Sequence, residues 1–519
     1  MASQSTHQVR KRRLVIVSNR LPIVLKPDPN GGWKVIPGSG GLVTALAPVL
    51  RDRGGLWIGW SGLTETTDRR IDRLLNDAVS DTGYAYEAVS LTEDEVHGYY
   101  YGFANEVLWP LFHDLQTRCN FDPHFWTVYR QVNRKFASAI AEHTHPSDTI
   151  WVHDYHLMGV AADLRRWRPK TKIGFFLHIP FPPLDIFLKL PWRFEILNAL
   201  LAYDVVGFQT QRDKRNFIGC LRKMRHDVTV RGKGQVVTAT VDRQTVRVGS
   251  FPISIDFKEF ASAANTREVA GRVSRIRSDL GSGSGGRKLL LGVDRLDYTK
   301  GIPERLKAFA NALERYPRLR GKACLVQLVV PSRELIPKYK NLKLEIERLV
   351  SRINGRFAQT DWLPVHYMYR SVDRTELLAL YRAADIALIT PLKDGMNLVA
   401  KEYCSSNIDN DGVLILSEFA GAAPQLQAAA LLVNPFHVEA VADTVAAACD
   451  MPKAERQRRM KALRKKIRQT DIYWWLDSFL GAGFDRDLMA FPPPEDYIPH
   501  ETTRPMTRYY GQPAWMSQA

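Results

Sequence analysis

The amino-acid sequence predicts an α/β protein made of two doubly wound domains, each a parallel sheet covered by helices. Three observations support this prediction. Short apolar runs of strand type alternate with helical patterns, these runs form two successive series, and a Gly-Ser stretch at residues 281–286 separates the series. The chain of 519 residues is also too long for one ordinary hydrophobic core.

The predicted strands define the expected domains. The first series is Leu14–Val17, Trp57–Trp60, Thr149–Val152, Ile173–Leu177 and Val205–Phe208, and the second is Leu289–Val293, Leu325–Val330, Ile386–Thr390 and Val413–Leu416. We expect a basic tail at 1–12, an N-terminal domain at 13–270, a C-terminal domain at 285–480 and a tail at 481–519. Ligands of such folds bind at the carboxyl ends of strands, so the expected site is the cleft between two facing domains.

Composition and charge narrow the function classes. The net charge of +17 fits nucleic acid, an anionic surface or phosphorylated substrates. No nucleic-acid-binding motif accompanies it, and the basic stretch Lys453–Arg468 has the pattern of a solvated helix face. The chain has no run of about 18 apolar residues, no secretory signal and no CxxC pair. We therefore expect a cytoplasmic protein with no nucleic-acid or membrane partner.

Polar and glycine residues gather directly after several predicted strands. These clusters are Ser18–Arg20, His153–His156, His178–Phe181, Arg295–Gly301, Pro331–Arg333 and Asp394–Asn397. Parallel strands bring their carboxyl ends to one edge of a sheet, so each half of the chain should gather its clusters at one edge.

Two clusters of the second half suit a nucleotide diphosphate. Arg295 and Lys300 are cations in a strand-to-helix loop, as a diphosphate requires, although a surface loop with two solvated cations remains the alternative. Gly395 permits close approach of the backbone to a ligand, and Glu402 lies far enough along the following helix to bind ribose hydroxyls. The alternative for this cluster is an ordinary helix cap by Asp394 or Asn397.

Other residues point to sugars, phosphates or a metal. Arg20 and Arg333 follow strands in opposite halves, and paired arginines clamp phosphates. Tyr100 and Trp109 lie in an aromatic segment that fits either sugar stacking or a hydrophobic core. His153 and His156 invite a metal hypothesis, but HExxH is absent and no cysteine lies near, so we expect no metal.

Together the motifs resemble the trehalose-6-phosphate synthases, a family of retaining glycosyltransferases with two Rossmann-like domains (GT-B). The matching strings are VIVSNRLP, GGLVTAL, FANEVLWPLFH, WVHDYHL, FFLHIPFP, GVDRLDYTKG, PLKDGMNLVAKEY and LSEFAGAA. They run in this order from about residue 15 to residue 423, which makes the resemblance highly specific.

The resemblance implies two sets of ligand contacts. The acceptor glucose 6-phosphate would contact Arg20, Tyr100, Trp109, Asp154 and Arg333. The donor nucleotide sugar would contact Gly40, Gly41, His178, Arg295, Lys300, Val372, Asp394, Gly395, Met396, Asn397, Leu398, Val399 and Glu402. The catalytic residues would be Asp154, His178, Arg295, Lys300 and Asp394, with no metal and no cofactor.

The implied reaction transfers glucose from a nucleoside diphosphate glucose to glucose 6-phosphate. Uridine is the family's usual base, and adenosine and guanosine stay open. The motifs provide no obvious nucleophile–acid pair of carboxylates, so we expect a front-face reaction without a protein–sugar bond. A homo-oligomer, dimer or tetramer, is expected. The alternative function is a catalytically silent sugar-phosphate sensor with the same pocket.

Overall fold

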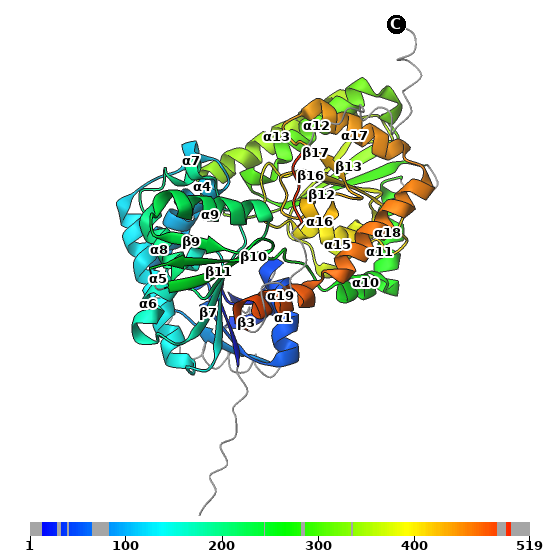
Figure 1. The fold of residues 1–519 in the computed structure, drawn as a ribbon. Helices are drawn as coiled ribbons and strands as arrows, with labels where there is room; N and C mark the ends of the chain where they lie inside the picture. Colours follow the sequence, from blue (N-terminus) through cyan, green and yellow to red (C-terminus); the bar gives the residue numbers. More distant parts are fainter. Residues whose placement is uncertain are drawn as a thin grey trace, which may run out of the picture. The chain divides into compact units, whose positions relative to one another are not determined.

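The computed structural model describes residues 13–27, 33–38, 41–64, 83–242, 244–281, 286–333, 336–484 and 495–499 (Figure 1). These residues divide into two compact units. The N-terminal unit holds the chain up to Asp256 and a returning segment that begins at Thr470. The C-terminal unit holds Phe257–Gln469 and residues 495–499. No described helix is long and apolar enough to cross a membrane.

The N-terminal unit is built on a mixed nine-stranded sheet with the order β5-β4-β1-β6-β7-β8-β11-β10-β9. Its strands are β1 (Leu14–Arg20), β4 (Leu56–Trp60), β5 (Ala85–Ala88), β6 (Thr149–His153), β7 (Lys172–Leu177), β8 (Val205–Phe208), β9 (Val228–Arg231), β10 (Val236–Val241) and β11 (Gln244–Ser250). The pairs from β5 to β11 are parallel, and β10 pairs antiparallel with both β11 and β9. A separate hairpin joins β2 (Ile23–Pro27) and β3 (Trp33–Pro37).

Helices connect the strands of this unit. They are α1 (Gly41–Arg53), α3 (Glu93–Glu95), η1 (Val96–Leu108), α4 (Trp109–Phe112), η2 (Gln116–Arg118), α5 (Pro123–His143), η3 (Tyr155–Leu157), α6 (Val160–Trp167), α7 (Leu184–Phe187), α8 (Arg193–Leu201), α9 (Gln211–Met224) and the returning α19 (Ile472–Phe484). The η1 segment is a π-helix, a form that is rare and often found at functional sites.

The C-terminal unit has a six-stranded, all-parallel sheet with the order β14-β13-β12-β15-β16-β17. Its strands are β12 (Lys288–Arg295), β13 (Ala323–Val330), β14 (Val365–Tyr369), β15 (Ile386–Ile389), β16 (Val413–Ser417) and β17 (Leu431–Val433). Its helices are α10 (Phe257–Ala264), α11 (Arg267–Asp279), η4 (Tyr298–Lys300), α12 (Ile302–Arg315), η5 (Pro317–Leu319), α13 (Pro337–Phe357), α14 (Arg374–Ala383), α15 (Leu398–Ser406), α16 (Ala423–Leu426), α17 (Val438–Asp450) and α18 (Lys453–Gln469).

The predicted fold class is confirmed, and every predicted strand is present. The strands β1, β6 and β7 are neighbours in one sheet, and β13, β12 and β15 are neighbours in the other. The polar clusters therefore lie at the carboxyl ends of adjacent strands, three in each unit. The sequence did not predict the antiparallel edge β9–β11, nor β14, whose residues after Val365 are only half-buried.

The predicted domain limits differ from the two units in the structure. Residues 257–270 were expected in the N-terminal domain but lie in the C-terminal unit, where α10 and α11 pack against α14. Residues 470–480 were expected in the C-terminal domain but belong to the N-terminal unit. The cause is Trp475 of α19, which is fully buried, lies 4.7 Å from Trp151 between ring centroids and donates its indole N–H to the Phe251 carbonyl (3.0 Å). The predicted tail at 1–12 lies outside the described residues, as does most of the predicted tail at 481–519, of which residues 481–484 form the end of α19 and residues 495–499 are described.

We expect Trp475→Ala to destabilise the N-terminal unit by about 3–5 kcal/mol, because truncating a buried tryptophan leaves a large cavity. Hydrogen–deuterium exchange should become faster in β6 and β7 and stay unchanged in β12 and β13. The control is Trp167→Ala, whose side chain is 43% exposed, and which should change stability by no more than about 0.5 kcal/mol. Faster exchange confined to the C-terminal strands would contradict the assignment of α19.

Candidate functional site

In the N-terminal unit, several contacts hold Arg20 at the end of β1. Trp57 Nε1 donates to Ser18 Oγ (2.8 Å), which donates to the backbone carbonyl of Arg20 (2.7 Å). The Arg20 guanidinium lies 4.1 Å from the centroid of the Trp60 ring. Gly62 makes room for it, because Gly62 has a φ of +97° and a Cβ there would lie 1.8 Å from Arg20 Nη1. This exposed cation is thus oriented by the strand that carries Trp60.

A series of ring contacts connects Arg20 to Asp154 and His178. Tyr100 lies 6.0 Å from Trp60 and stacks on His156 with an interplanar angle of 12° and a centroid distance of 5.9 Å. His156 Nδ1 lies 4.0 Å from Asp154 Oδ2. Asp154 has a φ of +75°, and its Oδ1 accepts from the backbone N–H of His178 (3.2 Å). The structure therefore brings these predicted residues together within one unit.

Trp109 joins the same group through Tyr155. Its ring lies 5.7 Å from Tyr155, which lies 3.9 Å from His156. Most of the aromatic segment around Trp109 packs in the hydrophobic core, which was the alternative to sugar stacking. Tyr99, for example, is fully buried and donates its hydroxyl to Asn19 Oδ1 (2.9 Å). The half-buried Tyr100 is the member that suits ligand contact.

His178 forms a buried pair with His153. The distance from His153 Nδ1 to His178 Nε2 is 3.1 Å, and the rings of Trp151, Phe176 and Trp475 surround the pair. Burial lowers the pKa of His178 to about 3, and burial and the neighbouring His178 lower the pKa of His153 well below its ordinary value. Both rings are therefore neutral at physiological pH, so His178 can form hydrogen bonds but is not a cation.

The C-terminal unit presents a loop of cations after β12. Arg295 ends the strand with an exposed side chain, and within the described part of the chain it makes no ion pair. Lys300 closes η4, and α12 starts directly after Gly301, with Pro303 in its first turn. Gly301 has a φ of +62°, and a Cβ there would lie 2.5 Å from the Thr390 carbonyl, so only glycine fits.

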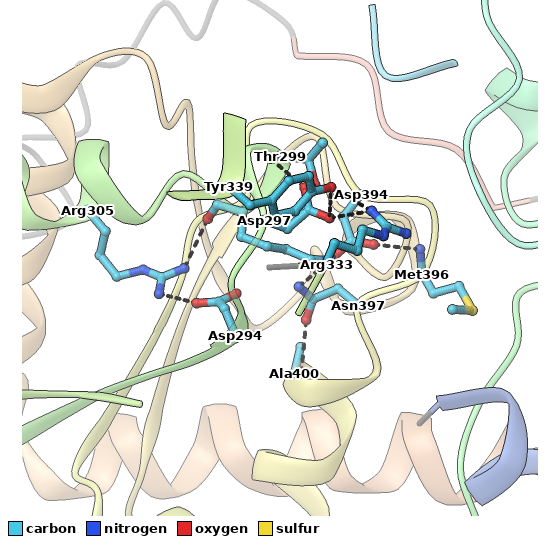
Figure 2. A network of polar contacts seen from close by, with 11 residues as sticks. Asp294, Asp297, Thr299, Arg305, Arg333, Tyr339, Asp394, Met396, Asn397 and Ala400 are labelled. Carbon is cyan, nitrogen blue, oxygen red and sulfur yellow. Dashed lines mark hydrogen bonds and ion pairs between the residues drawn. The ribbon is translucent and has the colours of Figure 1, made fainter. Parts of the chain in front are cut away.

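Lys300 and Asp394 form the centre of the second cluster. Figure 2 shows Asp394 beside Met396 and Asn397. Lys300 Nζ lies 2.5 Å from Asp394 Oδ2. The Asp394 carboxylate also accepts from the Met396 backbone N–H (3.2 Å) and from Asn397 Nδ2 (3.2 Å). Asn397 has a φ of +62° and caps α15 by accepting from the Ala400 N–H (3.2 Å). Asn397 is thus the helix cap, and Asp394 instead fixes Lys300 and the loop.

Two further carboxylate–arginine pairs flank this centre, and the sequence prediction missed both aspartates. Buried Asp294 pairs with buried Arg305 of α12. Asp297 pairs with Arg333 (3.1 Å), the arginine that follows β13 (Figure 2). The available signal was their position beside Arg295 in the string GVDRLDYTKG, where three charges lie within four residues.

Most of the remaining predicted donor residues lie near α14 and α15. Glu402 Oε2 accepts from the Tyr381 hydroxyl (2.8 Å), and burial raises the pKa of Glu402. Val372 is half-buried directly before α14, the helix that carries Tyr381. Gly395 and Leu398 are buried, and Val399 is half-buried. Gly41 is the first residue of α1, and Gly40 lies outside the described residues.

The histidine cluster contains His153 and His156, the residues of the metal hypothesis. Among the residues that the structure describes, no three His, Cys, Asp or Glu side chains are arranged to hold a metal ion. His153 and His156 instead make the ring and hydrogen-bond contacts given above.

The buried histidine pair predicts a pH dependence of stability. The pKa of His178 is about 3 when folded and 6.5 without the fold, so the unfolded chain binds more protons between these values. The stabilisation is complete above pH 6.5 and is lost as the pH falls toward 3. From pH 7 to pH 5, His178 should remove about 2 kcal/mol from the free energy of unfolding of the N-terminal unit. Urea denaturation at both pH values should show a smaller loss for His178→Gln, and an equal loss would contradict this account.

The chain is similar to known proteins along most of its length. The model of glycosyltransferase family 20 matches residues 12–482. Trehalose-6-phosphate synthase of Mycobacterium sp. (strain JLS) is 45% identical over 475 residues, which cover 90% of this chain and 95% of that relative. The enzyme of the same name from Mycobacterium avium (strain 104) is also 45% identical over 475 residues, covering 90% and 94%.

Two solved structures are similar along almost the whole chain. An alpha,alpha-trehalose-phosphate synthase (UDP-forming) from Burkholderia xenovorans in complex with glucose-6-phosphate superposes with a TM-score of 0.81 at 36% identity, covering 91% of this chain and 99% of that one. An E. coli structure with UDP-2-fluoro glucose bound gives a TM-score of 0.81 at 35% identity, covering 93% of this chain and 100% of that one. The resemblance in the motifs is thereby confirmed, and the chain belongs to glycosyltransferase family 20.

Proposed function

We propose that this glycosyltransferase transfers glucose from UDP-glucose to glucose 6-phosphate and forms trehalose 6-phosphate and UDP. One observation carries the proposal. Lys300 and Arg333 are held in a single hydrogen-bonded network at the carboxyl ends of β12 and β13, because the Lys300 backbone N–H donates to the carbonyl of Asp297 (3.1 Å) and the Asp297 carboxylate accepts from Arg333. A reaction that joins a diphosphate donor to a phosphorylated acceptor needs two separate anion contacts, and this network supplies one cation for each.

The donor would bind the C-terminal unit. Arg295 and Lys300 would contact the diphosphate, and the N-terminal amides of α15 would add positive dipole charge. Glu402 would accept the ribose hydroxyls, since its carboxylate already accepts from a hydroxyl, that of Tyr381. Relatives are described as UDP-forming, which supports uridine as the base. The loop residues 395–397 and the start of α15 would contact the donor sugar.

The residues proposed for the acceptor are Arg20, Tyr100, Trp109, Asp154 and Arg333. In the N-terminal unit, the Arg20 guanidinium and the neighbouring rings of Tyr100 and Trp109 suit a sugar phosphate, since aromatic faces stack on sugars. Asp154 would accept from a sugar hydroxyl. Arg333 of the C-terminal unit would contact the phosphate. The Burkholderia xenovorans relative in complex with glucose-6-phosphate supports this acceptor.

The chemistry would proceed at the front face of the donor sugar, with retention at the reacting carbon. The acceptor hydroxyl would attack from the side on which the diphosphate leaves, and a departing phosphate oxygen would take its proton. Asp394 is a poor nucleophile here, because Lys300 and two N–H donors already occupy its carboxylate. Arg295 and Lys300 would stabilise the developing negative charge, and neutral His178 would hold the donor sugar.

Product formation is the test. Purified protein, glucose 6-phosphate and UDP-, ADP- or GDP-glucose should give α,α-trehalose 6-phosphate by NMR, with the highest kcat/KM for UDP-glucose. Binding of both substrates without product would instead identify the silent sensor. The homo-oligomer and the cytoplasmic location stay predictions, which size-exclusion chromatography with light scattering and cell fractionation would test.

We expect Arg295→Ala and Lys300→Ala each to lower kcat by about a hundredfold or more, the scale of removing one electrostatic stabiliser. Activity should survive a chelator, because these cations supply the charge that a metal provides elsewhere. The control is Arg318→Ala, an exposed cation of the same unit paired with Asp450 (2.5 Å), which should leave kcat unchanged. Loss of activity with the chelator and recovery with magnesium would contradict the assignment.

The acceptor phosphate should be essential. A charge-assisted hydrogen bond contributes about 1.5–3 kcal/mol, so losing the contacts of Arg20 and Arg333 should reduce kcat/KM by several powers of ten for free glucose. Arg20→Gln should reduce kcat/KM for glucose 6-phosphate about 10- to 100-fold and leave the value for glucose nearly unchanged. Similar wild-type rates with glucose and glucose 6-phosphate would refute the proposed binding of the acceptor phosphate by Arg20 and Arg333.

A further inference from the structure

Asp297 is a buried carboxylate in the loop after β12, and both of its oxygens are engaged (Figure 2). Its Oδ1 accepts from the backbone N–H and from the hydroxyl of Thr299, each at 3.0 Å. Its Oδ2 accepts from Arg333 Nη1 at 3.1 Å. The carboxylate therefore joins the turn that precedes Lys300 to the arginine that follows the neighbouring strand.

Tyr339, in the first turn of α13, completes the arrangement on the Arg333 side. Arg333 Nη1 donates to the Tyr339 hydroxyl (2.7 Å), and that hydroxyl lies 3.5 Å from Asp297 Oδ2. The Arg333 and Asp297 side chains are 7% and 3% exposed. Both contacts use Nη1, so they hold one end of the guanidinium and fix the plane of the whole group.

The backbone of Arg333 also needs support from its surroundings. Its φ is +52°, in the left-handed region that costs a residue with a Cβ free energy. A free arginine side chain samples many rotamers, and a bound phosphate would have to select one of them. The ion pair with Asp297 selects the rotamer before the ligand arrives, which is the physical basis of preorganisation.

The charge of Asp297 matters for this role. Burial alone would raise the pKa of Asp297, but Arg333, Lys300, the hydrogen bond from the Thr299 backbone and Arg295 together outweigh burial and lower it, so the group is a carboxylate at physiological pH. A neutral amide in its place would lose the ion pair and turn an N–H donor toward the guanidinium. The contact with Thr299 would survive, because an amide keeps one carbonyl oxygen.

We propose that Asp297 is a positioning residue that orients Arg333 for the phosphate of the acceptor. The inference rests on the proposed function and deepens it, because it names what sets the geometry of the phosphate contact. Asp297 touches neither substrate. Its effect on the acceptor passes through Arg333, whereas its contact with Thr299 supports the loop of Lys300.

A double-mutant cycle on binding tests this inference. The affinity for glucose 6-phosphate is measured by calorimetry in the presence of UDP, for the wild type, Asp297→Asn, Arg333→Gln and the double variant. Each single variant should weaken binding of glucose 6-phosphate about 10- to 100-fold. The double variant should be within about twofold of Arg333→Gln, because Asp297 acts only through that arginine. The affinity for UDP alone should change less than about threefold.

The matched control is Asp148→Asn in the N-terminal unit. Asp148 is also buried and bonds an arginine side chain, Arg13 (3.2 Å), and a backbone N–H, that of His145 (2.9 Å). Its replacement should leave the affinity for glucose 6-phosphate unchanged. If Asp297→Asn does not fold, Tyr339→Phe takes its place in the cycle, with a weaker effect of about threefold in the same direction.

Two results would overturn the inference. One is an affinity of Asp297→Asn for glucose 6-phosphate within twofold of the wild type, and the other is additive losses in the double variant. Product formation is scored separately. If the wild type binds glucose 6-phosphate but forms no product, the proposed function is refuted, and the cycle still decides the role of Asp297. If the wild type does not bind glucose 6-phosphate, both the proposed function and the role of Asp297 are refuted.

Discussion

Pairing of cations with buried carboxylates shapes the carboxyl edge of the C-terminal sheet. Arg305 pairs with Asp294, Arg333 with Asp297 and Lys300 with Asp394. Asp294 lies near the end of β12, Asp297 in the loop after it, and Asp394 in the loop after β15. Removing a charge from water costs several kcal/mol, so a buried cation at this edge needs a fixed partner even without substrate. The partner also sets where each cation points. The aspartate carboxylates thus orient the cations that would bind the anionic groups of the substrates.

One consequence concerns the strongly basic composition. Each of the three pairs joins one cation to one carboxylate and adds nothing to the net charge. Among the predicted donor residues, Arg295 is the one cation that forms no ion pair within the described part of the chain. The net charge of +17 thus arises largely elsewhere, for example on α18, where Lys461, Lys465 and Arg468 are exposed. Substrate recognition at this edge depends on the placement of a few cations and on dipoles at helix starts, and the overall field of the protein is a separate property.

The candidate residues of the N-terminal unit are held mainly by aromatic and neutral contacts, in contrast to the ion pairs of the C-terminal unit. Its candidate residues are linked by ring contacts, from Trp60 through Tyr100 to His156, and by a pair of neutral histidines. Aromatic rings and neutral donors suit a sugar, whose hydroxyls and apolar faces carry no charge. The π-helix η1 positions this arrangement. Asn105 Nδ2 donates to the Tyr100 carbonyl (2.7 Å) within it, which fixes the turn that presents the Tyr100 ring.

The sequence predicted the parts of the site that follow from strand direction. Parallel strands place their carboxyl ends together, so the clusters after β12, β13 and β15 could be expected at one edge before the strand order was known. The pairing of Asp297 with Arg333 could not be predicted, because these residues are 36 positions apart and meet only through the register that sets Arg295 beside Val330. The sequence also could not predict that α19 packs in the N-terminal unit, because an apolar helix after Thr470 fits the core of either unit.

The structure of the wild-type protein with UDP and glucose 6-phosphate bound would test the central claim most directly. If carboxylates place the cations before substrate binds, Arg333 should contact the acceptor phosphate while its distance to Asp297 stays near 3.1 Å. Lys300 should lie against the diphosphate with Asp394 still beside it. A complex in which Arg333 has left Asp297 to reach the phosphate, or in which the phosphate is bound without Arg333, would contradict the account.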